Sequence, residues 1–144
     1  MGMDVYESLF LGSKLSMTKI PWEQIESKLE AEEIANAESN DQVEKEICIL
    51  NMWLGKNPKF KYLFVNETHT YRSKKHVYLS FILENTEKEI KLDPLYSLGN
   101  RTRYGLKEFQ SILSTINVEV FQTALEMLNQ DITEPRFYID HDYA

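Results

Sequence analysis

The chain of 144 residues has little of several residue types, and each shortage excludes something. Cys48 is its single cysteine, so no intrachain disulfide can form and a reducing compartment such as the cytoplasm is expected. Five glycines and four prolines are too few for a linker-rich or disordered protein, and 42% hydrophobic residues can supply a core. The apolar patch at 9–11 is too short for a signal sequence or a membrane span. We expect one cytoplasmic domain over residues 1–144, with no membrane segment.

The chain also lacks the motifs that bind nucleotides or activate a nucleophile. It contains no Gly-x-Gly-x-x-Gly, Walker or Gly-x-Ser-x-Gly pattern. Its three histidines are His69, His76 and His141, and an extended chain would point His141 away from its acidic neighbours Asp140 and Asp142. We therefore expect no catalytic residue, no metal and no cofactor. A small hydrolase with a site built from His69, His76 and scattered acids remains an alternative hypothesis.

Charge, in contrast, is plentiful and separated along the chain. Residues 23–46 contain nine acids and two lysines, which gives them a net charge of −7, equal to that of the whole chain. Residues 56–107 contain eleven bases and five acids, and residues 108–144 contain seven acids and one base. Such separation steers charged partners and keeps a protein soluble, but it does not determine a fold.

Helical periodicity is clearest over residues 40–54. Apolar residues recur there at helical spacing and also cover the remaining faces, which predicts a central helix buried on several sides. Ser39 and Gln42 predict a capping box at its start, and Gly55 predicts its end. Cys48 is expected to pack inside this helix as a small apolar residue.

Three further helices are predicted around the central one. Pro21 suits the first position of a helix that would run to about Asn36 and carry a stripe of acids beside its apolar stripe. Periodicity predicts two more helices over 106–116 and 118–129, with Asn117 capping the second. The last two are expected to form a helical hairpin packed on a sheet.

Alternating patterns predict an antiparallel meander of three to five strands over about residues 60–93, with residues 136–139 as a further candidate strand. The segment 76–84 alternates most clearly, and a four-residue loop should lead from it to a strand at 89–93.

The position of the first strand of the meander and the N-terminal segment complete the α+β prediction. The strand that begins near Phe60 is apolar on both faces, so we expect it inside the sheet, with a turn at Asn66 and Glu67. Residues 3–15 have no clear period and suggest a short helix or an edge strand. The predicted architecture is a meander packed against a buried central helix and a C-terminal helical hairpin.

Elimination favours a binding protein over an enzyme. Concentrated acidic charge without catalytic motifs predicts a small module that binds a basic protein, as a stoichiometric inhibitor, immunity-type protein or antitoxin blocks a toxin or nuclease. The residues expected at the partner-binding surface are Trp22, Glu23, Glu26, Glu30, Glu33, Glu38 and Asp41.

The basic middle segment, 56–107, gives a different hypothesis, a nucleic-acid-associated protein. Cations interleaved with aromatic residues can hold a phosphate backbone while bases stack on the rings. The residues expected at such an interface are Lys59, Lys61, Arg72, Lys74, Lys75, Arg101 and Arg103. The net charge of −7 and the lack of an RNA-binding motif weigh against it.

Overall fold

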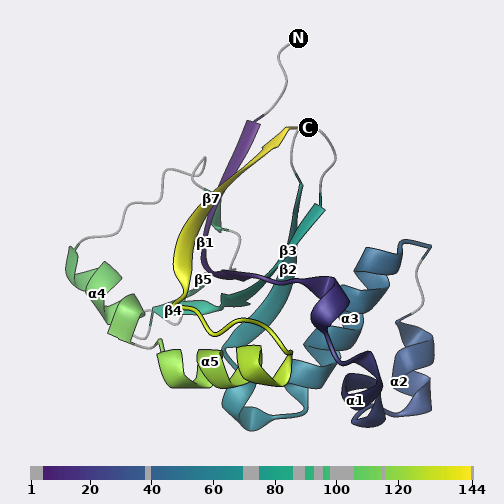
Figure 1. Ribbon diagram of the computed structural model, residues 1–144. Helices are drawn as coiled ribbons and strands as arrows, with labels where there is room; N and C mark the ends of the chain where they lie inside the picture. Colours follow the sequence, from purple (N-terminus) through teal and green to yellow (C-terminus); the bar gives the residue numbers. More distant parts are fainter. Residues whose placement is uncertain are drawn as a thin grey trace.

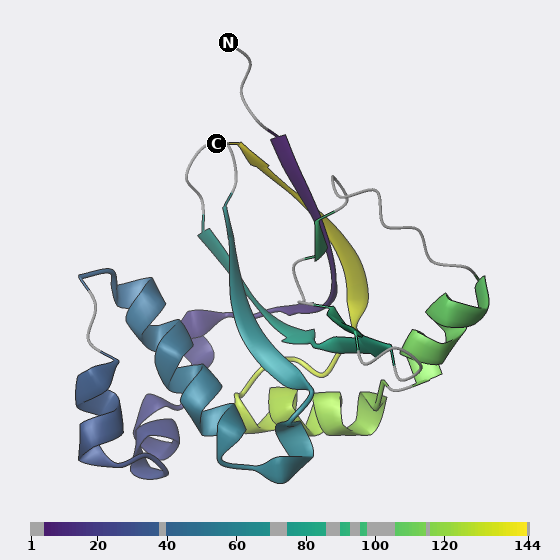
Figure 2. The same cartoon turned by 180° about the vertical axis from the view of Figure 1, so that it is seen from behind.

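The computed structural model describes residues 5–37, 40–69, 75–85, 90–92, 96–97, 106–114 and 116–143. Its architecture is α+β, as predicted, with helices packed against an antiparallel sheet (Figures 1 and 2). The strands are β1 (Val5–Lys14), β2 (Leu63–His69), β3 (Lys75–Phe81), β4 (Leu83–Asn85), β5 (Ile90–Leu92), β6 (Tyr96–Ser97) and β7 (Arg136–Tyr143). The helices are α1 (Trp22–Ser27), α2 (Ala31–Asn36), α3 (Gln42–Gly55), α4 (Leu106–Ser114) and α5 (Val118–Met127), with 3-10 turns η1 (Met17–Lys19) and η2 (Pro58–Phe60).

The sheet is organised around β1. One edge of β1 pairs with β3 through Gly12–Lys14 and with β6 through Ser8 and Leu9, while the other edge pairs with β7 along Val5–Gly12. The expectation of a short helix or an edge strand at 3–15 was therefore wrong, because this segment is the central strand. The candidate strand at 136–139 is confirmed as part of β7, which extends beyond it to Tyr143.

Gly12 allows β1 to lie this close to β3. A Cβ atom at this position would come within 2.1 Å of the Leu79 carbonyl oxygen and 2.9 Å of the Ser80 Oγ. Real Cβ atoms do not tolerate such an approach, so glycine fits here because it has no side chain. β1 curves strongly along its length, and its partner on this edge changes from β6 to β3 (Figure 1).

β2 was expected inside the sheet, but it forms an edge and pairs only with β3 in the sheet order. It runs straight through Asn66 and Glu67, where a turn was expected. Its free edge is covered by the side chain of Asn51 from α3: Asn51 Nδ2 donates to the Val65 carbonyl at 2.9 Å, and the Val65 N–H donates to Asn51 Oδ1 at 2.7 Å. The asparagine amide thus takes the place of a neighbouring strand.

The predicted strand at 76–84 is divided at Ile82, whose N–H donates to the Tyr62 carbonyl at 2.7 Å. β3 ends before this residue and β4 begins after it. The hairpin expected here is confirmed, because β4 pairs antiparallel with β5 in register Leu83 to Leu92. This pair forms a separate two-stranded sheet beside the five-stranded one.

One face of β2 and β3 packs against α3 and α5. Phe81 on β3 stacks on Phe121 of α5 with ring centroids 5.1 Å apart, and Leu79 and Leu50 are fully buried between the layers. Burial of each such side chain contributes about 1.5–3 kcal/mol relative to exposure. Asn117 caps α5 as predicted, since its Oδ1 accepts from the backbone N–H of Val120 at 3.2 Å. α4 lies beside β4, at the opposite side of the molecule from α1 and α2 (Figure 1).

The other face of β3 is covered by neighbouring strands. Tyr78 lies among the rings of Phe10 from β1 and Tyr138 from β7, with ring centroids 4.8 and 4.9 Å away. Beside this cluster, the Ser80 hydroxyl donates to the buried Asn66 side chain. The sheet is therefore buried on both faces around β3, because β1 and β7 curve over it.

The central helix is confirmed as α3, but two of its predicted details were wrong. Asp41 caps it, since Asp41 Oδ1 accepts from the backbone N–H groups of Val43 and Glu44, so Ser39 is not the capping residue. Cys48 is exposed rather than buried. It shares an outward stripe with Glu44 at four-residue spacing, whereas the next residue, Ile49, is buried.

The helix expected over residues 21–36 is interrupted, giving α1 and α2. Leu29 is buried between them, and Glu30 adopts an extended conformation as the N-cap of α2. Pro21 is the N-cap of α1 rather than its first residue. Within the described ranges, none of the helices combines the length and apolar character that a membrane span needs.

Candidate functional site: the acidic face of α1 and α2

Two buried side chains decide which way the acids of α1 and α2 point. Ile25 of α1 and Leu29 after it are buried, and Trp22 and Ile34 pack against the core, so the polar positions of these short helices face outward. Both helices lie on the outer side of α3, away from the sheet (Figures 1 and 2). Acids at these outward positions are therefore available to solvent or to a partner.

We define the acidic face as Glu23, Glu26, Glu30 and Glu32. Glu23, Glu30 and Glu32 are exposed and Glu26 is partly exposed. Glu23, Glu26 and Glu32 make no ion pair with a residue that the structure describes. The Glu30 carboxylate caps α2 by accepting from the Glu33 backbone N–H, and its charge helps to raise the pKa of Lys56. The interruption at Leu29 means that these acids do not form one continuous helical stripe, as the sequence had suggested, but they do share one outer layer.

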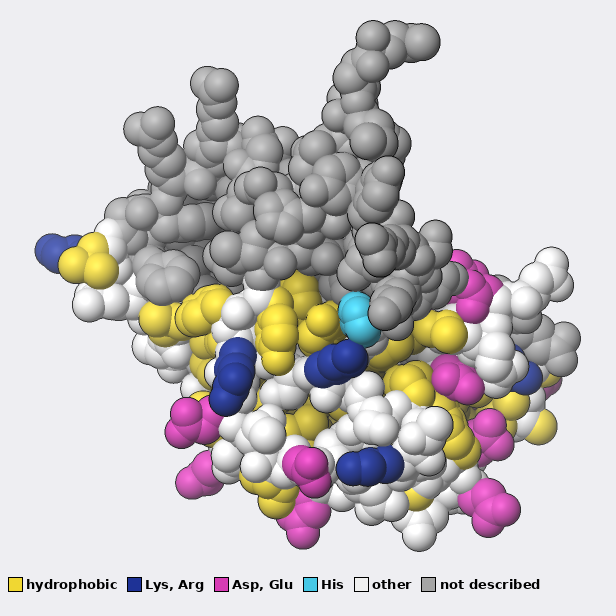
Figure 3. Space-filling model, turned by 45° about the horizontal axis from the view of Figure 1, so that its top comes forward, with side chains coloured by type: hydrophobic (Ala, Val, Ile, Leu, Met, Phe, Trp, Pro, Cys, Tyr) yellow, Lys and Arg dark blue, Asp and Glu magenta, His cyan; other side chains and the backbone are white. Residues whose placement is uncertain are grey.

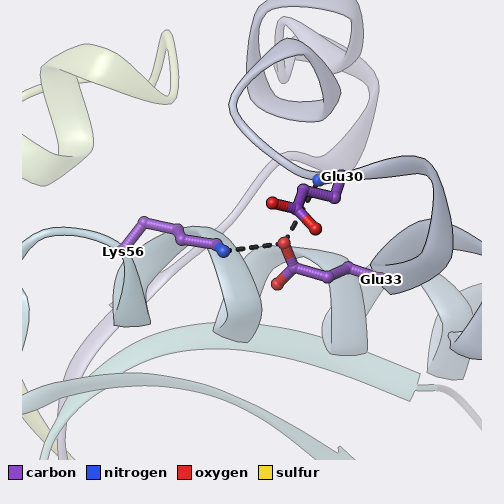
Figure 4. A network of polar contacts seen from close by, with 3 residues as sticks. All are labelled: Glu30, Glu33 and Lys56. Atoms are coloured by element: carbon purple, nitrogen blue, oxygen red, sulfur yellow. Dashed lines mark hydrogen bonds and ion pairs between the residues drawn. The ribbon is translucent and has the colours of Figure 1, made fainter.

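Glu33 differs from the acidic face because it already has a cation. Its Oε1 accepts from Lys56 Nζ at 2.7 Å and from the Glu30 backbone N–H at 3.1 Å (Figure 4). The hydrogen bond from Lys56 and then that from Glu30 lower the pKa of Glu33, and the same contact raises the pKa of Lys56. Glu33 therefore ties α2 to the end of α3, and we assign it to the structure rather than to the surface for a partner.

The other predicted surface residues have mixed positions. Trp22 is partly buried and packs against the core, at the start of α1 and next to Glu23. Asp41 is occupied as the cap of α3. Glu38 lies outside the described residues. The structure thus brings together Trp22, Glu23, Glu26 and Glu30 of the predicted set, and it adds Glu32, which the prediction omitted.

An apolar pocket of about 280 Å³ lies close to this layer. Trp53, Phe60 and Met127 line it together with Lys28 and Lys56, the partner of Glu33. This pocket could not be predicted from the sequence, because its walls come from α3, η2 and α5 and no local pattern joins them.

The residues predicted for nucleic-acid binding are not gathered in the described part of the chain. Lys59 and Lys61 are exposed near the start of β2, whereas Lys75 pairs with His69 at the far end of that strand, roughly 20 Å away for a seven-residue strand. The other four predicted residues, Arg72, Lys74, Arg101 and Arg103, lie outside the described residues.

The histidines of the hydrolase alternative do not face each other. The register of β2 and β3 pairs His76 with Thr68 and His69 with Lys75, so the two histidines are not cross-strand partners. Among the residues that the structure describes, no group of three or more His, Cys, Asp or Glu side chains is placed to hold a metal ion.

A second, polar pocket of about 360 Å³ was not predicted at all. Two segments far apart in the sequence form it, the end of β1 with η1 and the chain from Gln130 into β7. Its lining residues are Ser13, Lys14, Ser16, Lys19, Gln130, Asp131, Thr133, Glu134, Arg136 and Tyr138.

Comparison with known proteins assigns no family to this chain. No protein family, no curated protein and no solved structure was found to match this chain. Function has to be argued from its surface.

Proposed function

We propose that this protein is a cytoplasmic protein-binding module, a stoichiometric inhibitor of the immunity or antitoxin type that blocks a basic toxin or nuclease. The observation that carries this proposal is the acidic face, in which Glu23, Glu26 and Glu32 have no ion-pair partner among the described residues, while Glu30 caps α2 close to Lys56. Charge left uncompensated on one outer layer of a folded protein favours a partner of opposite charge.

Charge complementarity affects the rate of association and the choice of partner more than it affects affinity. Complementary charge steers the encounter and raises the association rate by about 10- to 1000-fold at low salt. At physiological ionic strength the screening length is about 8 Å, so the acids must be close to the bound partner to act. Four acids on two adjoining short helices meet this condition.

An inhibitor also needs an apolar anchor, and the pocket at Met127 can supply one. Interfaces obtain most of their affinity from a few side chains buried in well-packed pockets, inside a polar rim. Met127 is 46% exposed at this pocket, which makes it available for contact. In the proposed arrangement, the acidic face contacts the basic partner while the nearby apolar pocket, whose lining includes Lys28 and Lys56, accepts an apolar side chain of that partner.

The test is affinity capture from the native host with wild-type protein and two charge-matched variants. Glu23→Gln/Glu32→Gln removes two acids of the acidic face without touching the Glu30–Glu33 contact, and Glu119→Gln/Glu126→Gln removes two exposed acids of α5. We expect a basic protein whose activity is blocked at a 1:1 ratio. Its association rate should fall about three- to tenfold for the first variant and stay unchanged for the second.

The apolar anchor is tested separately with Met127→Gln, using Ile132→Gln as a control because both side chains are exposed and only Met127 lines the pocket. Dissociation should be faster for the first variant only. Capture of neutral or acidic proteins alone, or equal binding by the wild type and Glu23→Gln/Glu32→Gln, would contradict the proposed function.

A further inference from the structure

We propose that the polar pocket between the end of β1 and the start of β7 binds the phosphate group of a small phosphorylated molecule. This pocket is distinct from the acidic face and from the apolar pocket, with which it shares no lining residue. Its volume of about 360 Å³ falls at the lower end of the range typical of small-ligand sites.

Three cations line the pocket, and none of them forms an ion pair with a described residue. Lys14 comes from β1, Lys19 from η1 and Arg136 from β7. Cationic side chains also gather near the middle of the face shown in Figure 3, while most acidic side chains lie nearer its outline.

The strand register brings two of these cations onto one face of the sheet. Gly12 pairs with Arg136, and Lys14 follows two residues after Gly12 on the same strand. Lys14 and Arg136 are therefore diagonal neighbours on one face, about 7–8 Å apart at the backbone. Two cations that line the same pocket repel each other, and an anion bound between them reduces this repulsion.

The walls of the pocket are fixed before any ligand binds. The Gln130 side chain joins the two segments, because its Oε1 accepts from the Ser16 N–H at 2.7 Å and its Nε2 donates to the Ser16 carbonyl at 3.0 Å. The hydroxyls of Ser13 and Thr133 are hydrogen-bonded to each other at 3.0 Å across the same gap. Such preorganisation reduces the entropy that a ligand must lose on binding.

The remaining groups indicate what the phosphate is attached to. Asp131 and Glu134 also line the pocket and would oppose a bare anion, but their carboxylates can accept hydrogen bonds from hydroxyl groups. A phosphate monoester of a hydroxyl-rich molecule, such as a sugar phosphate, satisfies both sets of groups. Guanidinium and ammonium groups would bind its phosphate, and the acids would accept from its hydroxyls.

The experiment measures binding of inorganic phosphate, glucose 6-phosphate and glucose to the full chain by titration calorimetry at low salt. We expect glucose 6-phosphate to bind more tightly than inorganic phosphate, and glucose not to bind. The variant Lys14→Gln/Arg136→Gln should weaken glucose 6-phosphate binding about tenfold or more. The control Lys59→Gln/Lys107→Gln changes the charge equally at exposed positions outside the pocket and should leave binding unchanged.

A variant that is expected to tighten binding shows whether weaker binding in the other variant results from a lost contact or from misfolding. Glu134→Gln should tighten binding of inorganic phosphate several-fold, because it removes a repelling charge. The proposal is overturned if neither phosphate compound binds the wild type at millimolar concentration. It is equally overturned if Lys14→Gln/Arg136→Gln binds as the wild type does, or if the control variant loses binding to the same extent.

Discussion

Replacing Asn51 with alanine should destabilise the fold by roughly 2–4 kcal/mol, because its amide makes two hydrogen bonds to the backbone of Val65. Each such bond contributes about 1 kcal/mol net, and a buried donor or acceptor left without a partner costs roughly 1–3 kcal/mol. Val65 is only 1% exposed, so water cannot readily replace the lost amide. The free edge of β2 would then be left with unpaired groups.

Urea unfolding followed by the fluorescence of Trp53 and Trp22 gives the free energy of unfolding directly. A loss of 2–4 kcal/mol also corresponds to a decrease in the midpoint of thermal unfolding of roughly 6–12 °C for a chain of this size. Asn36→Ala, at the exposed end of α2, is the matched control and should change the free energy by less than about 0.5 kcal/mol.

A second substitution separates the two hydrogen bonds of Asn51. Asn51→Asp keeps an acceptor for the Val65 N–H, but it loses the donor to the Val65 carbonyl while the carboxylate is ionised. Protonation restores a donor, so this variant should recover stability relative to the wild type as the pH is lowered. A free energy of unfolding for Asn51→Ala within about 0.5 kcal/mol of the wild type, the usual size of a surface substitution, would contradict this role of Asn51. So would an Asn51→Asp variant that shows no such recovery.

Three further predictions follow from single side chains. Gly12→Ala should destabilise the protein by about 3 kcal/mol or more, measured by urea unfolding, because the new methyl group would meet the Leu79 carbonyl and force β1 away from β3. An NMR titration should show the pKa of Glu33 below its ordinary value of 4.5, since Lys56 lowers it. The stabilisation of the fold by the Glu33–Lys56 contact is therefore present at neutral pH and lost as acid protonates Glu33. The free energies of unfolding of the wild type and Glu33→Gln should then converge at low pH. Cys48 should react completely with a thiol reagent in the native protein at a rate close to that of the unfolded chain, whereas slow reaction would show that it is covered.

The helices that could be predicted from the sequence are those whose ends and faces are determined locally. α5 has a capping asparagine, Asn117, and buried residues Phe121, Leu125 and Leu128 at helical spacing. Its own sequence therefore specifies both where it begins and which face is buried. α3 was found for the same reason. Its cap could not be chosen by pattern alone, because Ser39 and Asp41 are both good capping residues.

The central position of β1 could not be predicted, because it depends on partners at the other end of the chain. The strand is buried on both faces around Phe10 and Leu11, and burial on both faces removes the alternation that identifies a strand. The interruption at Leu29 was missed for a related reason: a buried leucine fits a continuous helix and a helix end equally well, and tertiary packing decides between them.

The candidate surface was predicted in part. Exposure of Glu23, Glu26 and Glu30 follows from charge alone, since acids are seldom buried without a partner. The contact between Glu33 and Lys56 joins residues from two helices, and no periodicity within either helix indicates it. The polar pocket was beyond prediction because Ser16 and Gln130 become neighbours only when the sheet has formed.

The pairing of β1 with β7 has a consequence for synthesis of the protein. Among the described strands, β1 comes first in the sequence and β7 last, so the edge of β1 that pairs with β7 stays unpaired during synthesis until β7, which ends at Tyr143, has emerged. Pairing of β1 with β7 closes a long loop and is therefore slow. Until then, the unpaired backbone groups on this edge of β1 can form hydrogen bonds with another nascent chain. This topology therefore favours one form of misfolding in particular, the exchange of β7 between two copies of the protein.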